Sequence, residues 1–183
     1  MRGTKNRNIL DEFCIKFCSV VEAHCKYIVV SGFVAISSGR ARATEDIDII
    51  IEKIDLPSFF LLHNDLVKEG FVCMQSDLPE EIFRYLEDKL AVRYTLSDLP
   101  LPEMELKFSK DALDEYQIKT RVKLPLTGLD LWFSSINMNI AFKEGLLKSD
   151  KDLKDAEHLR KIYPELVSED EISNIKQMIR KLR

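Results

Sequence analysis

Two aspartates separated by one residue give the clearest chemical signal in this sequence of 183 residues. Asp46 and Asp48 alternate with Ile47 and Ile49 in a run that predicts a β-strand over 47–51. In a strand, this alternation places both carboxylates on one face, where their charges repel unless a cation neutralises them. Carboxylate oxygens are suitable ligands for Mg²⁺ or Mn²⁺. The pair therefore indicates a divalent-metal site, and the alternative is a solvated face of an edge strand.

A sharp turn is expected upstream of the aspartates. The short apolar run 27–30, rich in β-branched residues, predicts a buried strand that ends at Ser31 and Gly32. One or two helical turns are expected over 33–38, and Gly39 ends them. The predicted order is a strand, a corner of small residues, a short helix and the aspartate-bearing strand.

This combination resembles the signature of the nucleotidyltransferase superfamily of the DNA polymerase β type. The signature is a hydrophobic residue, Gly, then Gly or Ser, a spacer, and Asp-hydrophobic-Asp or Glu-hydrophobic. Here Val30-Ser31-Gly32 is followed by 13 residues and by Asp46-Ile47-Asp48-Ile49, with Ser31 in the place of the first Gly. The position of Arg42, four residues before Asp46, looks most like the small stand-alone bacterial and archaeal members, which include abortive-infection type toxins.

The resemblance implies a metal-dependent transfer of a nucleoside monophosphate from an NTP to a hydroxyl acceptor, with release of pyrophosphate. Asp46, Asp48 and Glu105 would hold one or two Mg²⁺ or Mn²⁺ ions. Lys143 would complete the catalytic set. The residues expected to contact the nucleotide are Ser31, Gly32, Arg40, Arg42, Thr44 and Asp152.

The third acid is assigned to a later strand, predicted over 103–108. Met104, Leu106 and Phe108 face one side of this strand, and Glu103, Glu105 and Lys107 face the other. The setting of Glu105 is similar to the hydrophobic-acid-hydrophobic context of the family's third carboxylate, and Glu103 is its substitute. The alternative is an exposed sheet face with alternating Glu and Lys, which needs no metal.

The turn and the two arginines after it are the expected phosphate contacts. Gly32 lets the backbone come close to a phosphate, and the amides that follow it would donate to phosphate oxygens. Arg40 and Arg42 would stabilise the charge of the departing pyrophosphate. Their alternative partners are the nearby acids Glu45, Asp46 and Asp48.

Two late segments extend the resemblance. Residues 140–143 resemble the family's helix whose lysine faces the nucleotide, here Lys143, and 151–159 resemble the Lys-Asp-x-x-Asp segment that follows it. Asp152 would orient Lys143 through a salt bridge, or it would cap a helix that starts after Ser149. The two roles are compatible.

The expected fold class is α/β, or α+β, with a mixed central sheet, flanking helices and a polymerase β-like nucleotidyltransferase fold. Residues 1–133 would form the catalytic domain, and 134–183 would form a helical C-terminal portion packed on it. Further strands are predicted over 71–74, 91–96, 103–108, 117–124 and 129–133, the last two as a hairpin, with a Pro-rich turn over 97–102. Helices are predicted over 9–25, 57–69, 79–89, 136–147 and 150–163, and from 168 onward.

Composition limits the possible partners. A net charge of −4 and a pI of about 5.5 argue against a protein that coats nucleic acid, although a local basic groove could hold a strand end. The four cysteines show no Cys-x-x-Cys spacing and are expected to be reduced thiols of a cytoplasmic protein. No signal peptide or membrane span is expected. The expected partners are an NTP and an acceptor such as tRNA, a protein hydroxyl or a small molecule.

Two other functions stay open. The first is a nucleotide-binding or antitoxin-like regulatory protein on a degenerate transferase scaffold, which Ser31 and the glutamate at Glu105 would favour. The second is an interaction domain in which Asp46 and Asp48 are surface charge.

Overall fold

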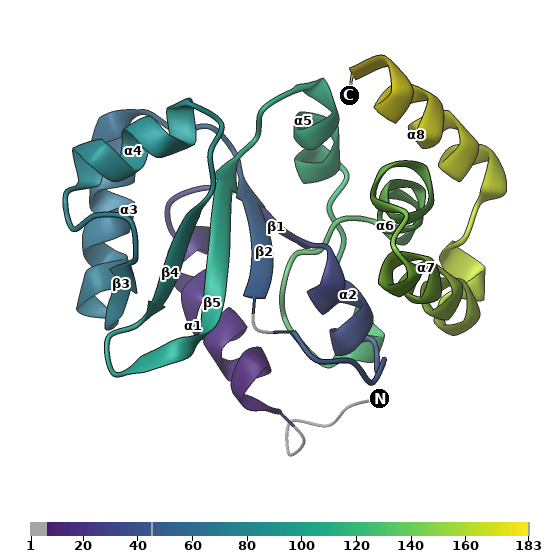
Figure 1. The fold of residues 1–183 in the computed structure, drawn as a ribbon, viewed down its shortest axis with the longest axis horizontal. Coiled ribbons are helices and arrows are strands. Elements are labelled where there is room, and N and C mark those ends of the chain that lie inside the picture. The colour runs from purple at the N-terminus through teal and green to yellow at the C-terminus, as the bar shows by residue number, and fades with distance from the viewer. Residues whose placement is uncertain (1–6, 45, 183) are drawn as a thin grey trace.

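A mixed β-sheet forms the centre of the protein (Figure 1). The computed structural model describes residues 7–44 and 46–182. Within these residues the sheet has five strands in the order β1-β2-β5-β4-β3. The strands are β1 (Tyr27–Val30), β2 (Asp46–Ile51), β3 (Phe71–Cys73), β4 (Val92–Leu96) and β5 (Leu99–Phe108). β2 and β5 are parallel, and the other neighbouring pairs are antiparallel, as a mixed sheet requires.

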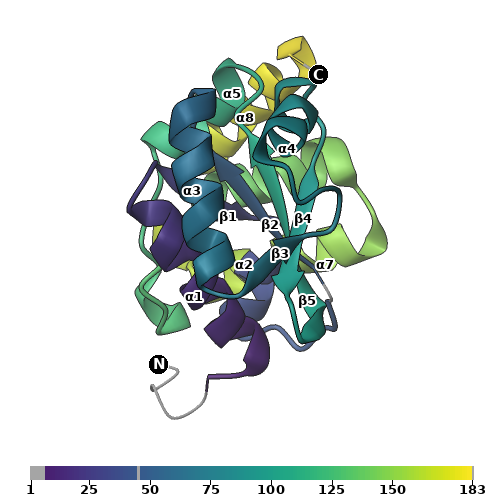
Figure 2. The ribbon, with the colours of Figure 1, turned by 90° about the vertical axis from the view of Figure 1, so that its left-hand side faces the viewer.

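The helices form two groups (Figures 1 and 2). α3 contacts both α1 and α4 and packs with them against the sheet, whereas α6 contacts α7 and α8 in a second group on the other side. The helices are α1 (Ile9–Glu22), α2 (Gly32–Ser37), α3 (Leu56–Lys68), α4 (Pro79–Glu87), α5 (Ala112–Lys119), α6 (Ile136–Phe142), α7 (Asp150–Ile162) and α8 (Glu169–Leu182). A π-helical turn, Lys143–Leu147, follows α6 directly. None of the helices in the described ranges is long and apolar enough to cross a membrane.

Capping boxes fix the start of two helices as predicted. The Asn8 side chain accepts from the backbone amide of Asp11, and the Asp11 carboxylate accepts from the amide of Asn8, so α1 begins at the next residue. Ser149 and Asp152 make the same reciprocal pair at the start of α7. Each such cap contributes about 1 kcal/mol to helix stability.

Buried isoleucines hold the aspartate-bearing strand in place. Ile47, Ile49 and Ile51 have no exposed surface, whereas Asp46 and Asp48 lie on the opposite face of β2. Burial of an aliphatic side chain of this size stabilises the fold by about 1.5–3 kcal/mol. A one-residue slip of β2 would bury the carboxylates instead, so the hydrophobic face fixes which way they point.

The predicted hairpin over 117–124 and 129–133 is wrong. Helix α5 occupies the start of the first predicted strand. Asp111 caps this helix by accepting hydrogen bonds from two backbone amides of its first turn. Of the expected ladder, the structure retains one antiparallel bridge, between Val122 and Phe133. A strong helix start therefore outweighs the alternation of apolar and basic residues that suggested a strand.

The Pro-rich turn predicted over 97–102 is shorter than expected. β5 begins at Leu99, which pairs with Leu96 of β4. The Thr95 hydroxyl donates to the carbonyl oxygens of Leu99 and Pro102. In the described residues, β5 pairs with β2 from Glu103 onward. Pro100 and Pro102 therefore lie where β5 extends past β2, and the missing N–H of a proline costs little there.

Candidate active site

The predicted acids lie together on one face of the sheet. β2 and β5 run parallel with Asp46 opposite Glu103 and Asp48 opposite Glu105. Because side chains alternate along both strands, these four carboxylates face the same side. Asp46 is exposed, and the other three are half-buried. The structure thus places Asp46, Asp48 and Glu105 side by side, as the resemblance implied.

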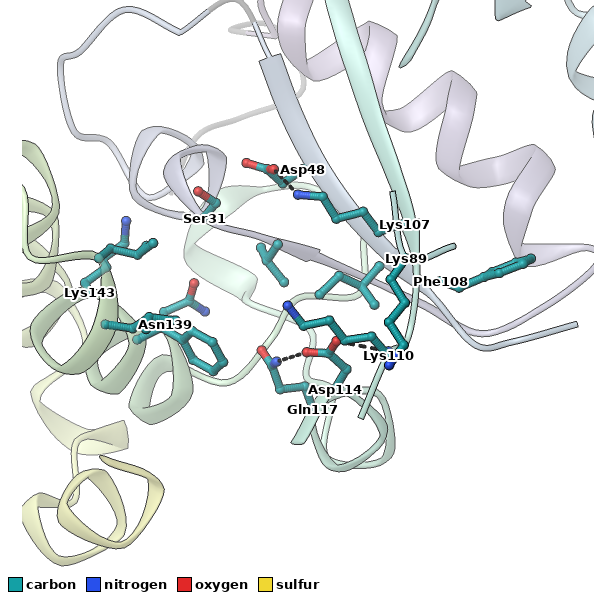
Figure 3. A pocket seen from close by; sticks show the side chains of 15 residues that line it. Ser31, Asp48, Lys89, Lys107, Phe108, Lys110, Asp114, Gln117, Asn139 and Lys143 are labelled. Carbon is teal, nitrogen blue, oxygen red and sulfur yellow. Dashed lines mark hydrogen bonds and ion pairs between the residues drawn. The ribbon is translucent and has the colours of Figure 1, made fainter. Parts of the chain in front are cut away.

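A lysine that the sequence analysis did not select lies among these acids. Lys107 Nζ is 3.6 Å from Asp48 Oδ1 (Figure 3). It also contacts Glu105 Oε1. Arg93 of β4 contacts the same group from the other side, with Nη2 3.4 Å from Glu105 Oε2 and Nε 3.5 Å from Glu103 Oε2. The alternation in β5 already placed Lys107 on the acidic face, but its contact with Asp48 depends on the register between the strands.

The two central acids have opposite pKa shifts. Burial raises the pKa of Asp48, and the negative charges of Glu105 and Asp46 raise it further against the effect of Lys107. Burial alone would also raise the pKa of Glu105, but Lys107 and Arg93 together hold that pKa below its usual value. Glu105 is therefore stabilised as an anion by the chain itself.

The acids are suitable in chemistry for a hard cation, but they are not arranged as a ligand set. All the donors are carboxylate oxygens, which Mg²⁺ and Mn²⁺ prefer. Across residues 7–44 and 46–182, no three carboxylate, imidazole or thiol groups are close enough together to hold a metal ion. Lys107 contacts Asp48 and Glu105 instead. Asp46 has a different partner, since Thr44 Oγ1 donates to its Oδ1 at 2.7 Å.

The turn after β1 brings an arginine against a glycine. Ser31 has φ 65° and ψ −136°, a backbone conformation that favours glycine, and α2 starts at Gly32. A Cβ atom added to Gly32 would lie 3.1 Å from Nη2 of Arg42 and 3.2 Å from its Cζ. The glycine therefore leaves the room in which the Arg42 guanidinium group rests. Val30, just before Ser31, pairs with Asp48 across β1 and β2, and Ser31 and Asp48 line the same cavity, so the turn lies beside the acids.

Three cations from this region converge on one buried acid. The carboxylate of Asp155, which is fully buried, accepts from Arg42 Nη1 at 2.6 Å and from Lys143 Nζ at 2.9 Å, and it pairs with Arg40. The nearby acids Asp46 and Asp48, offered by the sequence as partners of the arginines, are not their partners here, and Glu45 lies outside the described residues. Asp155 lies in the segment 151–159 that carries the late part of the resemblance, but no role was predicted for it.

Asp152 has both of the roles that its position suggested. It closes the capping box of α7, and its Oδ1 lies 3.5 Å from Lys143 Nζ. Burial lowers the pKa of Lys143, and the positive charges of Arg42 and Arg40 add to this effect against the attraction of Asp152. Lys143 is only 1% exposed, so its ammonium group is held firmly at the junction of α6 and α7.

A cavity of about 250 Å³ connects these groups (Figure 3). Asp48 and Lys107 lie on its sheet side, and Asn139 and Lys143 lie on its α6 side. Its other polar lining residues are Ser31, Lys89, Lys110, Asp114 and Gln117. Asn139 donates through Nδ2 to the backbone oxygens of Ser134 and Ser135, which holds its side chain at the cavity wall. A small polar ligand in this space would touch both Asp48 of the sheet and Lys143 of the helical portion.

The five-stranded sheet and the helical group beside it form a mixed α/β fold that is similar to solved structures of nucleotidyltransferase-like proteins. The fold class expected from the motif is confirmed. Two solved structures share this fold. One is the antibiotic-resistance factor ANT(2'')-Ia, with 14% identity and a TM-score of 0.53 over 94% of this chain and 91% of that chain. The other is an antigenic nucleotidyltransferase-like protein from Paracoccidioides brasiliensis, with 17% identity and a TM-score of 0.51 over 92% and 87%.

No protein-family model matches the sequence, and no curated protein matches it either. At this level of identity the two structures establish the fold, and the chemistry has to be argued from the residues of the site.

Proposed function

We propose that this protein is a metal-dependent nucleotidyltransferase that moves a nucleoside monophosphate from an NTP to a hydroxyl group and releases pyrophosphate. One observation carries the proposal. Asp46 and Asp48 share a sheet face with Glu105, directly beside the Ser31 turn, on a fold found in nucleotidyltransferase-like proteins. If the acids did not share this face, or if the turn did not lie beside them, the site would be only a charged surface of the sheet.

The phosphate side of the site is the turn together with the cluster around Asp155. Arg40, Arg42 and Lys143 bring three positive charges, and Asp152 and Asp155 bring two negative charges. One positive charge is left over next to the turn at Gly32. A triphosphate is strongly anionic, and charge-assisted hydrogen bonds from guanidinium and ammonium groups would orient it and stabilise the departing pyrophosphate.

The acid side of the site would hold the metal ion. Asp46 and Asp48 are the residues best suited to this, because Asp46 is exposed and both come from one rigid strand. A bound Mg²⁺ or Mn²⁺ would supply charge for the phosphate oxygens and would lower the pKa of the acceptor hydroxyl. The chain itself positions the reactants, since transfer of a phosphoryl group depends mainly on alignment and electrostatics.

Both halves of the chain would contribute to the reaction. We assign residues 1–133 to the catalytic domain with its acids and turn, and 134–183 to the helical portion that supplies Lys143 and Asp152. The proposed setting is the cytoplasm, where NTPs are present and where the four buried, unpaired cysteine thiols would stay reduced.

Transfer of a labelled α-phosphate tests the proposal. The protein is incubated with each labelled NTP, with Mg²⁺ or Mn²⁺, and with total RNA including tRNA, total protein or an aminoglycoside. We expect the label to enter one acceptor class with the wild type and with Lys154→Met, an exposed residue away from the cavity, but not with Asp48→Asn. Absence of label in every acceptor with every NTP would contradict the proposal.

A nucleotide-binding regulatory protein on the same scaffold is the second candidate. Lys107 favours it, because its ammonium group contacts Asp48 and Glu105, two of the acids that would otherwise hold a metal. This candidate predicts that NTP raises the melting temperature equally with and without Mg²⁺ and that no label is transferred.

A further inference from the structure

The contact between Lys107 and the acids suggests how many metal ions the site needs. We propose that the ammonium group of Lys107 replaces one of the two metal ions of a two-metal site, so that a single divalent ion binds, at Asp46 and Asp48. This inference rests on the proposed function and specifies its metal requirement.

The position of Lys107 Nζ is the first argument. It lies 3.6 Å from Asp48 Oδ1 and contacts Glu105 Oε1, so it joins two neighbouring strands through their acids. In a two-metal site, the ions lie about 3.5–4 Å apart and share carboxylates between them. Such sharing requires a cation that contacts both Asp48 and Glu105. Here Lys107 of the chain itself is that cation.

The second argument is that both carboxylate oxygens of Glu105 already contact cations of the chain. Its Oε1 contacts Lys107, and its Oε2 lies 3.4 Å from Arg93 Nη2. Arg93 is fixed opposite Glu105 by the antiparallel pairing of β4 and β5. A metal ion bound by Glu105 would have to compete with two cations that belong to the same sheet. Among residues 7–44 and 46–182, no cation pairs with Asp46, whose Oδ1 accepts a neutral hydrogen bond from Thr44.

The third argument is charge balance on this face of the sheet. The carboxylates of Asp46, Asp48, Glu103 and Glu105 carry four negative charges. Arg93 and Lys107 return two positive charges. The two negative charges that remain are neutralised by one divalent ion. Before the anionic nucleotide binds, a second ion would therefore leave an excess of two positive charges among groups that the chain already pairs.

The exposure of Lys107 makes the inference testable without a large change in stability. Its side chain is 41% exposed at the edge of the cavity, so removal of the charge is not expected to unfold the protein. Lys107→Met keeps most of the apolar stem but removes the charge, and Lys107→Arg keeps the charge. Lys154→Met is the matched control at an exposed position on α7.

Bound Mn²⁺ is counted by electron paramagnetic resonance in the presence of a non-hydrolysable NTP analogue. We expect one ion per chain for the wild type, for Lys107→Arg and for Lys154→Met, and two ions for Lys107→Met. Two ions on the wild type, or one ion on a folded Lys107→Met protein, would overturn the inference. Melting curves show whether each variant is folded, and the wild-type count alone decides the matter if Lys107→Met is not.

The proposed function fails differently from this inference. If the wild type and all variants bind no Mn²⁺ with the NTP analogue, the metal-dependent transferase itself is wrong. If the wild type binds two ions and transfers label, the transferase stands and the role of Lys107 as a replacement cation is wrong.

Discussion

Arg42 and Asp155, which are 113 residues apart in the sequence, form an ion pair with 2.6 Å between Nη1 and Oδ2. The pair connects the loop before β2 to helix α7. Because Arg42 also rests against Gly32, the turn at the start of α2 is held indirectly by the helical portion of the chain.

The substitution Asp155→Asn tests how much this connection contributes to stability. Removal of the one carboxylate that pairs with Arg40, Arg42 and Lys143 leaves three cations without their main partner in a buried setting. We expect the free energy of unfolding to fall by about 3 kcal/mol, as for other broken buried ion pairs. Urea denaturation measures it. The exposed neighbour Glu157 is the control, since Glu157→Gln should change stability by less than about 0.5 kcal/mol.

Replacement of Ser31 by glycine should stabilise the protein. Ser31 has a positive φ of 65° with a ψ of −136°, where a side chain costs about 1–3 kcal/mol. Ser31→Gly and Ser31→Ala both lose the hydroxyl, but only glycine relieves the backbone. The melting temperature of Ser31→Gly should therefore exceed that of Ser31→Ala. The free energy of unfolding should be about 1 kcal/mol higher for Ser31→Gly, after the greater flexibility of glycine is taken into account. Equal stability of the two variants would show that the backbone there is not strained.

Asp48→Asn should raise the stability of the metal-free protein by about 1 kcal/mol and abolish the stabilisation by Mg²⁺ and NTP. The pKa of Asp48 is raised above its ordinary value of 3.8, mainly by burial, so the ionised form is disfavoured in the folded state. The cost is present at neutral pH and disappears as the pH falls through the folded pKa toward 3.8. Thermal melts of the wild type and of Asp48→Asn at several pH values should show the gain in stability at pH 7 and no gain near pH 3.8. An intact NTP-induced shift in Asp48→Asn would remove Asp48 from the metal site.

His63 should make stability depend on pH on the acidic side of neutrality. Burial lowers the pKa of His63 below its ordinary value of 6.5, and its Nδ1 lies 2.9 Å from the Tyr94 hydroxyl. The unfolded chain takes up the proton more readily, so the free energy of unfolding falls as the pH drops below 6.5 through the folded pKa. His63→Phe should be less stable at pH 7.5, because Tyr94 loses its partner, but its stability should vary less between pH 7 and 5. An unchanged slope would place the titrating group elsewhere.

Local patterns predicted much of the fold because local interactions set those elements. The alternation of apolar and acidic residues in β2 and the capping pairs at Asn8 and Ser149 each act within a few residues. The hairpin prediction failed for the same kind of reason. The cap at Asp111 is also a local signal, and it was not weighed against the alternation that follows it.

The charge partners in the site could not be obtained in this way. Lys107 meets Asp48 only because β2 and β5 are parallel in one particular register, and the sequence analysis did not fix that register. Asp155 meets three cations because α7 packs against α2 and also against the π-helical turn that begins at Lys143. Both are contacts between distant segments, and single-sequence periodicity has no information on which segments meet.

The sheet order also determines when the site can exist during protein synthesis. β5 lies between β2 and β4, yet it is the last of the five strands to leave the ribosome. Before β5 emerges, the nascent chain can form two separate antiparallel pairs, β1 with β2 and β3 with β4, each with an open edge that can pair with a wrong partner. Asp48 and Glu105 first meet when β5 closes the gap between the pairs. A nascent chain shorter than this would expose its open strand edges and would lack the completed acidic face of the sheet.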